Sequence, residues 1–413
     1  LEKTLAHQEA FMRGAAASVL RRVDGEKALA LLEKALADKD ANVRSEAAGS
    51  LGCVGGEKAL ALLEQALADQ DVFVRINVAG ALGSVGGEKA LALLKKALAD
   101  QDASVRWSAA DALGCMGGEK AMVLLENTLA GKEADARSGA ASALGRMGGE
   151  KVLALLEKAL ADQDDRVRTN AATALGCVGG ERALELLEVA ITDKESRVLG
   201  NAAWALGSVG GEQALALLEK ALSDQDDFVR MNAADALGRV GSEQALALLE
   251  KALADQDARV REKAAESLGS VGSVHALALL EKALADQDSL VRSSAAAAIG
   301  SSGGEKELAI LEKTLASQDA GMRSEAAWAL RDVGGEKAVA LLEKALADMD
   351  GEVRIYAASA LGWVGGAKAR DALLKRLALE KDKKVLGTLS DTLRKQYSGA
   401  PAVEKALKEL RIP

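Results

Sequence analysis

The sequence contains few of the residues that interrupt helices, cross-link chains or bind metals. Its 413 residues include two prolines, Pro401 and Pro413, together with three cysteines and two histidines. Because proline bends or ends helices, any helix before Pro401 runs without a proline break. Charged residues interrupt every apolar segment before it reaches the roughly 18 residues that a membrane helix needs. We therefore expect a soluble, largely helical chain with no membrane partner.

A repeat of 31 residues organises the chain. Its most regular feature is an arginine in a recurring Asp-x-x-Val-Arg string, interrupted once by Leu199. This arginine stands at Arg13, Arg44, Arg75, Arg106, Arg137, Arg168, Arg230, Arg261, Arg292, Arg323 and Arg354. A fixed period of this length is typical of a solenoid, in which each unit contacts mainly its neighbours. Since a catalytic pair would occur once, we interpret the recurring Asp and Arg as structural, capping helices and bridging repeats.

Each repeat is predicted to form two helices. Between Glu88 and Asp100 the apolar residues recur at helical spacing, which predicts a first helix. Asp102 has the chemistry of an N-cap for a second helix, because its carboxylate can accept from the exposed amides of the first turn. Gly114 is expected to let neighbouring helices approach closely, and Gly117 suits a helix end with positive φ.

The motif Asp-x-x-Val-Arg-x-x-Ala-Ala-x-Ala-Leu-Gly-x-Val-Gly-Gly-Glu resembles the HEAT-like repeat. It is most similar to the short HEAT repeats of phycobilin lyases and of artificial alpha-helicoidal repeat proteins. The resemblance implies an all-α, right-handed alpha-alpha superhelix of about 13 two-helix repeats. It also implies that the second helices line a concave face, which such proteins commonly use to bind other proteins.

The predicted domain organisation has two parts. Residues 1–365 form the repeat array, and the chain opens inside a repeat, because Leu1 begins a segment that aligns with the middle of a first helix. Residues 366–413 lose the glycine and arginine signals and form a degenerate repeat with a Lys-rich C-terminal cap. This segment carries 12 Lys and Arg against 6 Asp and Glu, although the whole chain has a net charge of -9.

The cysteines point to a reducing compartment. Cys53, Cys115 and Cys177 occupy one repeat position in alternate units. With helices packing at about 8–10 Å, they would lie about 16–20 Å apart, well beyond the reach of a disulfide. Free thiols are typical of cytoplasmic proteins, and we expect that location, although an N-terminal signal cannot be assessed from a chain that opens inside a repeat.

Variation between repeats is concentrated on one face of the second helix. The most variable positions lie two residues before and one, two, five and nine residues after the recurring arginine; we call them the variable strip. Eight of the nine aromatic residues fall on it. Exposed large rings are typical of interface hot spots, so we predict that the strip binds a protein or peptide partner. The candidate partner-binding residues are Phe73, Ile76, Trp107, Arg197, Trp204, Phe228, Met231, Arg239, Trp328, Ile355, Tyr356 and Trp363. The alternative is that these rings are sheltered by adjacent helices as additional core.

Other functions are less well supported by the residues. Neither His7 nor His275 belongs to the paired His-Glu pattern with which HEAT-repeat hydroxylases hold iron, and no cysteine pair has zinc spacing. We expect no metal, no cofactor and no enzymatic activity. Basic and acidic side chains are mixed along the strip, whereas nucleic acid favours a basic stripe, so nucleic acid is not an expected partner. A monomer is expected. The alternative function is a bilin lyase or chromophore-handling chaperone subunit, which rests on the family resemblance.

Overall fold

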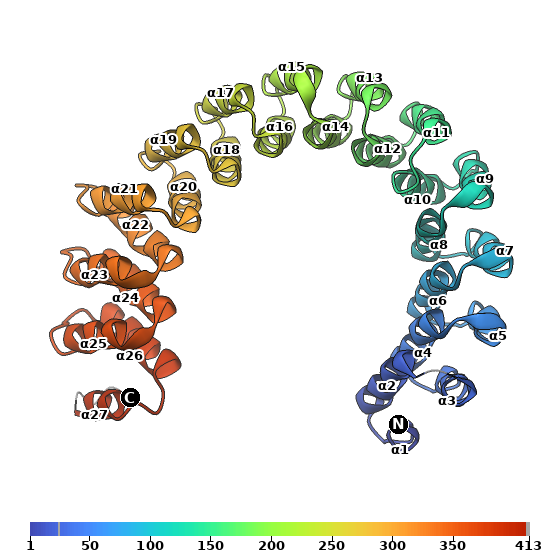
Figure 1. The fold of residues 1–413 in the computed structure, drawn as a ribbon, viewed down its shortest axis with the longest axis horizontal. Coiled ribbons are helices and arrows are strands. Elements are labelled where there is room, and N and C mark those ends of the chain that lie inside the picture. Colours follow the sequence, from blue (N-terminus) through green and yellow to red (C-terminus); the bar gives the residue numbers. More distant parts are fainter. Residues whose placement is uncertain (24, 410–413) are drawn as a thin grey trace. The chain divides into compact units, whose positions relative to one another are not determined.

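The structure is a computed structural model that describes residues 1–23 and 25–409. Over these residues it has 27 α-helices and one 3-10 helix, joined by turns (Figure 1). The chain divides into two compact units, Leu1–Leu217 and Leu218–Pro413, and helix α15 (Gly211–Ala221) crosses the boundary. Each unit is described by itself below.

Unit 1 consists of helix pairs. Its first helices are α1 (Glu2–Leu5), α3 (Glu26–Leu36), α5 (Gly56–Ala66), α7 (Gly87–Ala97), α9 (Gly118–Leu129), α11 (Glu150–Leu160) and α13 (Glu181–Ala190). Its second helices are α2 (Ala10–Val19, continued by η1, Leu20–Arg22), α4 (Ala41–Val54), α6 (Val72–Val85), α8 (Ala103–Met116), α10 (Ala134–Leu144), α12 (Asp165–Val178) and α14 (Ser196–Val209). The second helices contact one another along an inner row, and the first helices form an outer row (Figure 1).

Unit 2 continues the same pattern. Its first helices are α17 (Glu243–Ala252), α19 (Val274–Ala283), α21 (Glu305–Leu315), α23 (Gly335–Ala345) and α25 (Gly366–Leu377). Its second helices are α16 (Asp227–Val240), α18 (Ala258–Val271), α20 (Ser289–Ser302), α22 (Ala320–Val333), α24 (Gly351–Val364) and α26 (Lys383–Gln396), and a last helix, α27, spans Pro401–Glu409. The predicted all-α fold of stacked two-helix repeats is confirmed.

Local sequence signals explain the helix ends and the close stacking. Asp102 caps α8 by accepting a hydrogen bond from the Ser104 amide at 2.8 Å. Gly117 ends the helix with a φ of +64°, which glycine adopts without strain. A Cβ placed on Gly114 would lie 2.6 Å from the Ala143 carbonyl oxygen of the next second helix. Glycine at this position therefore sets how closely α8 and α10 approach.

The core of the inner row is made of small and medium aliphatic residues. In α6 the positions that repeat from unit to unit are buried, with Val74, Val78, Ala79 and Leu82 at 0% exposure. Complete burial of these side chains supplies the hydrophobic stabilisation of each repeat. These buried positions form one arc of the helix, which we call the buried arc, and the variable strip lies on the other side.

The recurring arginine links consecutive repeats. Arg44, which is 6% exposed, donates from Nη1 to the carbonyl oxygens of Asp38 and Lys39 in its own turn, at 2.9 and 3.3 Å. Its Nε and Nη2 donate to the two carboxylate oxygens of Asp69 in the next repeat, at 2.7 and 2.9 Å. Asp69 in turn accepts from the Asp71 amide at 2.8 Å. One guanidinium thus joins two interhelical turns through a two-pronged, charge-assisted contact.

We call each such arginine–carboxylate contact a rung. Regular rungs also join Arg13 to Asp38, Arg75 to Asp100, Arg137 to Asp162, Arg168 to Asp193, Arg230 to Asp255, Arg261 to Asp286 and Arg323 to Asp348. The hydrogen bond from Arg44 holds the pKa of Asp69 below its usual value, against the opposing effect of burial. The structural interpretation of the recurring Asp and Arg is therefore confirmed.

Four positions depart from the regular rung. Gly131 stands where the aspartate is expected, and Arg106 instead contacts Asp135, with Nε 2.8 Å from Oδ2. Leu199 supplies no guanidinium. Arg354 contacts Glu380, one residue further along than usual. Arg292 reaches the carbonyl oxygens of Asp286 and Gln287, but Ser317 replaces the aspartate, and the buried Nε of Arg292 has no hydrogen-bond partner.

Restoring the missing carboxylate opposite Arg292 should stabilise unit 2. Met322 stands where most repeats have valine, and its sulfur lies 3.4 Å from Ser317 Oγ, so the two positions should be changed together. We expect Ser317→Asp with Met322→Val to raise the free energy of unfolding by about 1–2 kcal/mol, because a buried donor gains its acceptor. Guanidinium chloride unfolding measures the change. The same pair of substitutions combined with Arg292→Gln should give no gain, and an equal gain there would contradict the explanation.

Glu380 should make the free energy of unfolding depend on pH in the acidic range. Its side chain is 2% exposed, and burial by itself would raise its pKa. Hydrogen bonds from the Asp382 and Lys381 amides and from Arg354 and Arg376 outweigh burial and lower the pKa from 4.5 to about 2. Because the folded-state pKa lies below the unfolded one, this stabilisation is complete above about pH 4.5 and is lost as the pH falls through about 2.

We therefore expect Glu380→Gln to lower the free energy of unfolding by about 3 kcal/mol at pH 7, and by progressively less toward pH 2. Unfolding at a series of pH values measures this difference. Asp391→Asn, which changes an exposed carboxylate on the same α26, is the matched control and should have little effect. A Glu380→Gln effect that stays constant from pH 7 to pH 2 would refute the assignment.

Candidate functional site

The variable strip presents large apolar side chains to solvent on the second helices of both units. Phe73 and Trp363 are 67% and 69% exposed, and Trp107, Phe228 and Tyr356 lie between 37% and 44%. Leaving large rings exposed forgoes the stabilisation that burial would provide. These five candidates are therefore placed where a partner can reach them.

The remaining apolar candidates are half-buried. They are Ile76, Trp204, Met231, Trp328 and Ile355. Because they are only half-exposed, these side chains fit the alternative of additional core better than the five exposed rings do. The strip thus contains both exposed and half-buried apolar side chains.

Phe73, Ile76 and Trp107 form a group on α6 and α8 of unit 1. Ser108 Oγ donates to the Ile76 carbonyl oxygen at 3.1 Å, which ties the two helices together beside these side chains. Trp107 lies against the backbone of α10, because a Cβ on Gly139 would be 3.1 Å from its Cδ1 atom. Glycine at 139 therefore makes room for the indole.

Trp328, Tyr356 and Trp363 form a second group on α22 and α24 of unit 2. The rings of Trp328 and Tyr356 meet edge to face, with centroids 5.9 Å apart and an angle of 71°. The Arg331 guanidinium carbon lies 4.3 Å from the centroid of Trp328 and 5.7 Å from that of Trp363. Asp332 orients this guanidinium through contacts of 2.8 and 3.0 Å. A cation–π contact thus joins the two tryptophans.

Arg331 is absent from the sequence-based candidates. It stands at the glycine position that lets second helices approach, as Gly300 and Gly362 do in the neighbouring repeats. The replacement of glycine by the largest cationic side chain in Ala-Leu-Arg331 is the signal that could have identified it. The variable positions alone did not include it.

The central candidates are divided between the units. Arg197 and Trp204 lie on α14 of unit 1, whereas Phe228, Met231 and Arg239 lie on α16 of unit 2. Arg239 Nε is 3.4 Å from Asp235 Oδ2 in the same helix. In unit 2, Arg259 is likewise paired, with Asp227 and Asp257. Carboxylates therefore offset much of the positive charge on this part of the strip.

The structure contains no metal-like cluster of His, Cys, Asp and Glu across residues 1–23 and 25–409. His275 lies on the outer row with Nδ1 2.6 Å from Glu243 Oε1, so it forms a surface pair with Glu243. Among the helices of these same ranges, none combines the length and the apolar character needed to cross a membrane.

Comparisons with known proteins agree with this geometry. The sequence pattern of the family described as HEAT repeats matches residues 1–75, 63–140, 122–200, 185–269, 250–331 and 308–394. None of the curated proteins matches the chain by sequence. The structure is similar to Kap95p in its complex with RanGDP, with 14% identity over 99% of this chain and 68% of Kap95p, and a TM-score of 0.56.

Two further solved structures are similar over large parts of their length. An engineered protein is 23% identical over 82% of this chain and 99% of its own, with a TM-score of 0.34. Human deoxyhypusine hydroxylase in complex with glycerol is 25% identical over 58% of this chain and 94% of its own, with a TM-score of 0.29. Because the HEAT pattern matches segments along nearly the whole chain and the helix pairs stack as it requires, the chain belongs to the family of HEAT-repeat proteins.

Proposed function

We propose that the protein is a non-enzymatic binding scaffold that holds a protein or peptide partner on the variable strip of its second helices. The observation that carries the proposal is the exposure of large rings, above all Phe73 and Trp363, on helices whose opposite arc is fully buried. A ring that contributes little to folding but occupies a variable surface position is suited to contact a partner.

The two aromatic groups have different surroundings. Around Phe73 and Trp107 most strip residues of α4 and α6 are small and neutral, including Ser45 and Asn77, whose side chains are hydrogen-bonded at 2.7 Å. The acids of this region are Glu46 and Asp111, and Asp111 is paired with Arg146. Neutral polar residues around aromatic anchors resemble the composition of antibody binding surfaces. This composition favours a neutral or apolar patch on a folded partner at the group in unit 1.

In the group of unit 2, the two tryptophans differ in their contacts and in their exposure. Trp328 contacts the Tyr356 ring edge to face and lies under the Arg331 guanidinium, whereas Trp363 remains 69% exposed. Trp363 is therefore the side chain that would enter a partner, and Trp328 is its support. Interface hot spots commonly consist of one such anchor surrounded by supporting contacts.

A protein partner also agrees with the fold comparison, because Kap95p, which has a similar fold, binds RanGDP. The mixed charge of the strip supports a protein or peptide partner over nucleic acid. The bilin-lyase alternative continues to rest on the family resemblance.

Removing the exposed rings of the groups in unit 1 and unit 2, with Phe228 left in place, should abolish partner capture without unfolding the chain. We expect the variant with Phe73, Trp107, Tyr356 and Trp363 changed to alanine to lose at least tenfold in the amount of captured partner. In the measurement, this variant and the unchanged protein are immobilised, and both are exposed to a lysate of the source. The proteins that each retains are then identified by mass spectrometry. Circular dichroism should show the same helicity for both.

The matched control removes exposed apolar side chains from the outer row. Val189 and Val274 are 63% and 68% exposed on α13 and α19, and their change to alanine should leave capture unaltered. Recovery of the same proteins from the aromatic variant and the unchanged protein would overturn the proposal. A large loss of helicity in the aromatic variant would show that these rings are core.

A further inference from the structure

Surface ion pairs of one kind recur along the outer row, at some seams of unit 1 and at successive seams of unit 2. A glutamate near the end of one first helix contacts a lysine 32 residues later, on the next first helix. Such pairs join Glu2 to Lys34, Glu64 to Lys96, Glu219 to Lys251, Glu250 to Lys282, Glu281 to Lys313, Glu312 to Lys344 and Glu343 to Lys375. Individually these exposed pairs contribute little to stability, but they cover the seam between first helices.

Both members of this pair are changed between α7 and α9. Lys95 replaces the glutamate, and Asn127 replaces the lysine. Elsewhere on these two helices the usual partners remain, as in the Lys120–Glu88 ion pair. Lys95 has no ion-pair partner within the part of the chain that the structure describes. The seam between α7 and α9 is thus left without its covering pair and with an unneutralised cation.

The apolar residues of the same seam also differ from the repeat. Val123 replaces an alanine and is 42% exposed. Leu124 is half-buried, although its counterparts Leu93 and Leu155 are only 2% and 3% exposed. Other seams of unit 1 lack only the lysine of the pair, since Gln65 and Val189 stand at that position. At the seam between α7 and α9 both members of the pair are replaced, and the exposed Val123 lies beside them.

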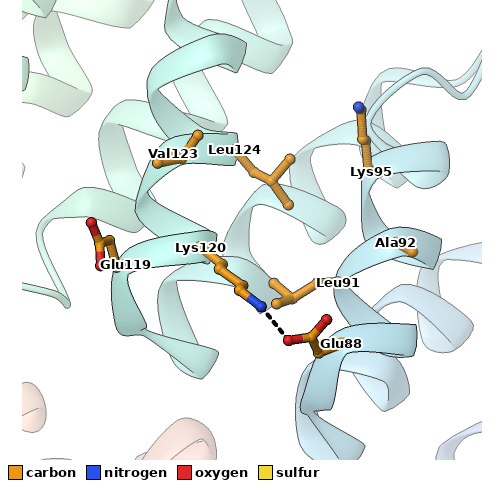
Figure 2. A pocket seen from close by; sticks show the side chains of 8 residues that line it. All are labelled: Glu88, Leu91, Ala92, Lys95, Glu119, Lys120, Val123 and Leu124. Atoms are coloured by element: carbon orange, nitrogen blue, oxygen red, sulfur yellow. Dashed lines mark hydrogen bonds and ion pairs between the residues drawn. The ribbon is translucent and has the colours of Figure 1, made fainter.

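These departures line an open groove of about 510 Å³ between α7 and α9 (Figure 2). Leu91, Ala92, Val123 and Leu124 form its apolar surface, and the Lys120–Glu88 pair bounds one end. Lys95 stands on α7 two turns beyond Glu88, at the other end. The volume falls within the range of about 300–1,000 Å³ that is usual for ligand sites.

We propose that this groove binds a short segment of a partner protein in which apolar side chains are followed by an aspartate or glutamate. The apolar side chains would cover Leu91, Val123 and Leu124, which removes exposed hydrocarbon from water. The carboxylate would pair with Lys95 and so replace the glutamate–lysine contact that the seam lacks. The direction of the segment follows from the charges, since Glu119 lies beside the opposite end and disfavours an acidic residue there.

This site is distinct from the variable strip. The groove lies on the first helices α7 and α9, whereas Phe73 and Trp107 lie on the second helices α6 and α8. A ligand in the groove therefore contacts a different row of unit 1, and its binding can be tested whether or not the strip binds a partner.

The test uses a variant in which the seam is returned to the regular repeat. Lys95→Glu, Val123→Ala and Asn127→Lys restore the residues that other repeats carry at these positions, so the variant should fold. A phage-displayed library of 12-residue peptides is selected in parallel on the full-length protein and on this repaired variant. We expect clones that bind the unchanged protein at least tenfold better, with apolar residues followed by Asp or Glu.

A synthetic peptide from such a clone then tests the charge contact. Changing its acidic residue to the corresponding amide, or Lys95 to Gln in the protein, should each weaken binding about tenfold, and the two changes together should cost little more than either alone. The Phe73→Ala with Trp107→Ala variant should bind the peptide unchanged, which separates this site from the strip.

Three results would overturn the proposal. The first is equal enrichment on the unchanged and repaired proteins, and the second is enrichment of peptides without a carboxylate. The third is sedimentation showing that the unchanged protein is a dimer and the repaired variant a monomer, because the groove would then be covered by a second copy of the chain.

Discussion

The stacking of this chain depends on a buried guanidinium that recurs in most repeats. Arg44 donates hydrogen bonds to the carbonyl oxygens of its own turn and to the carboxylate of the next turn at the same time. A single side chain therefore fixes the spacing between repeats. A buried ion pair of this kind stabilises only when all its hydrogen-bonding groups are matched. The regular rungs meet this condition because backbone amides, such as that of Asp71, supply the remaining donors to the carboxylate.

The rungs and the buried aliphatic arc define how the helices stack. Packing therefore does not restrict which residues stand at the other positions of the second helix. Phe73 and Trp363 can be large and exposed without altering how their helices pack. Arg331 shows the limit of this freedom. It occupies a glycine position at the interface of α22 and α24, and its guanidinium lies over the ring of Trp328.

Features that recur in most units could be predicted from the sequence, because repetition supplies many independent copies of the same constraint. The N-cap at Asp102, the close approach at Gly114 and the structural role of the arginine all belong to this class. Features that occur once could not. Nothing in the spacing distinguishes half-buried Trp328 from exposed Trp363, because the difference lies in contacts with Tyr356 and Arg331 on neighbouring turns. Likewise, Asp135 lies two residues before Arg137, at a position of the variable strip, yet it is the partner of Arg106 because Gly131 replaces the usual aspartate.

The same reasoning explains why the groove between α7 and α9 was not apparent from the sequence. The first helices vary little, and the three substitutions Lys95, Val123 and Asn127 lie too far apart in the sequence to suggest a common site. Stacking at an interval of 31 residues brings them to a single seam, where a missing ion pair and an enlarged apolar side chain act together. In a repeat protein, therefore, a departure is informative when it coincides in space with another departure, and an isolated change on a solvated helix carries little weight.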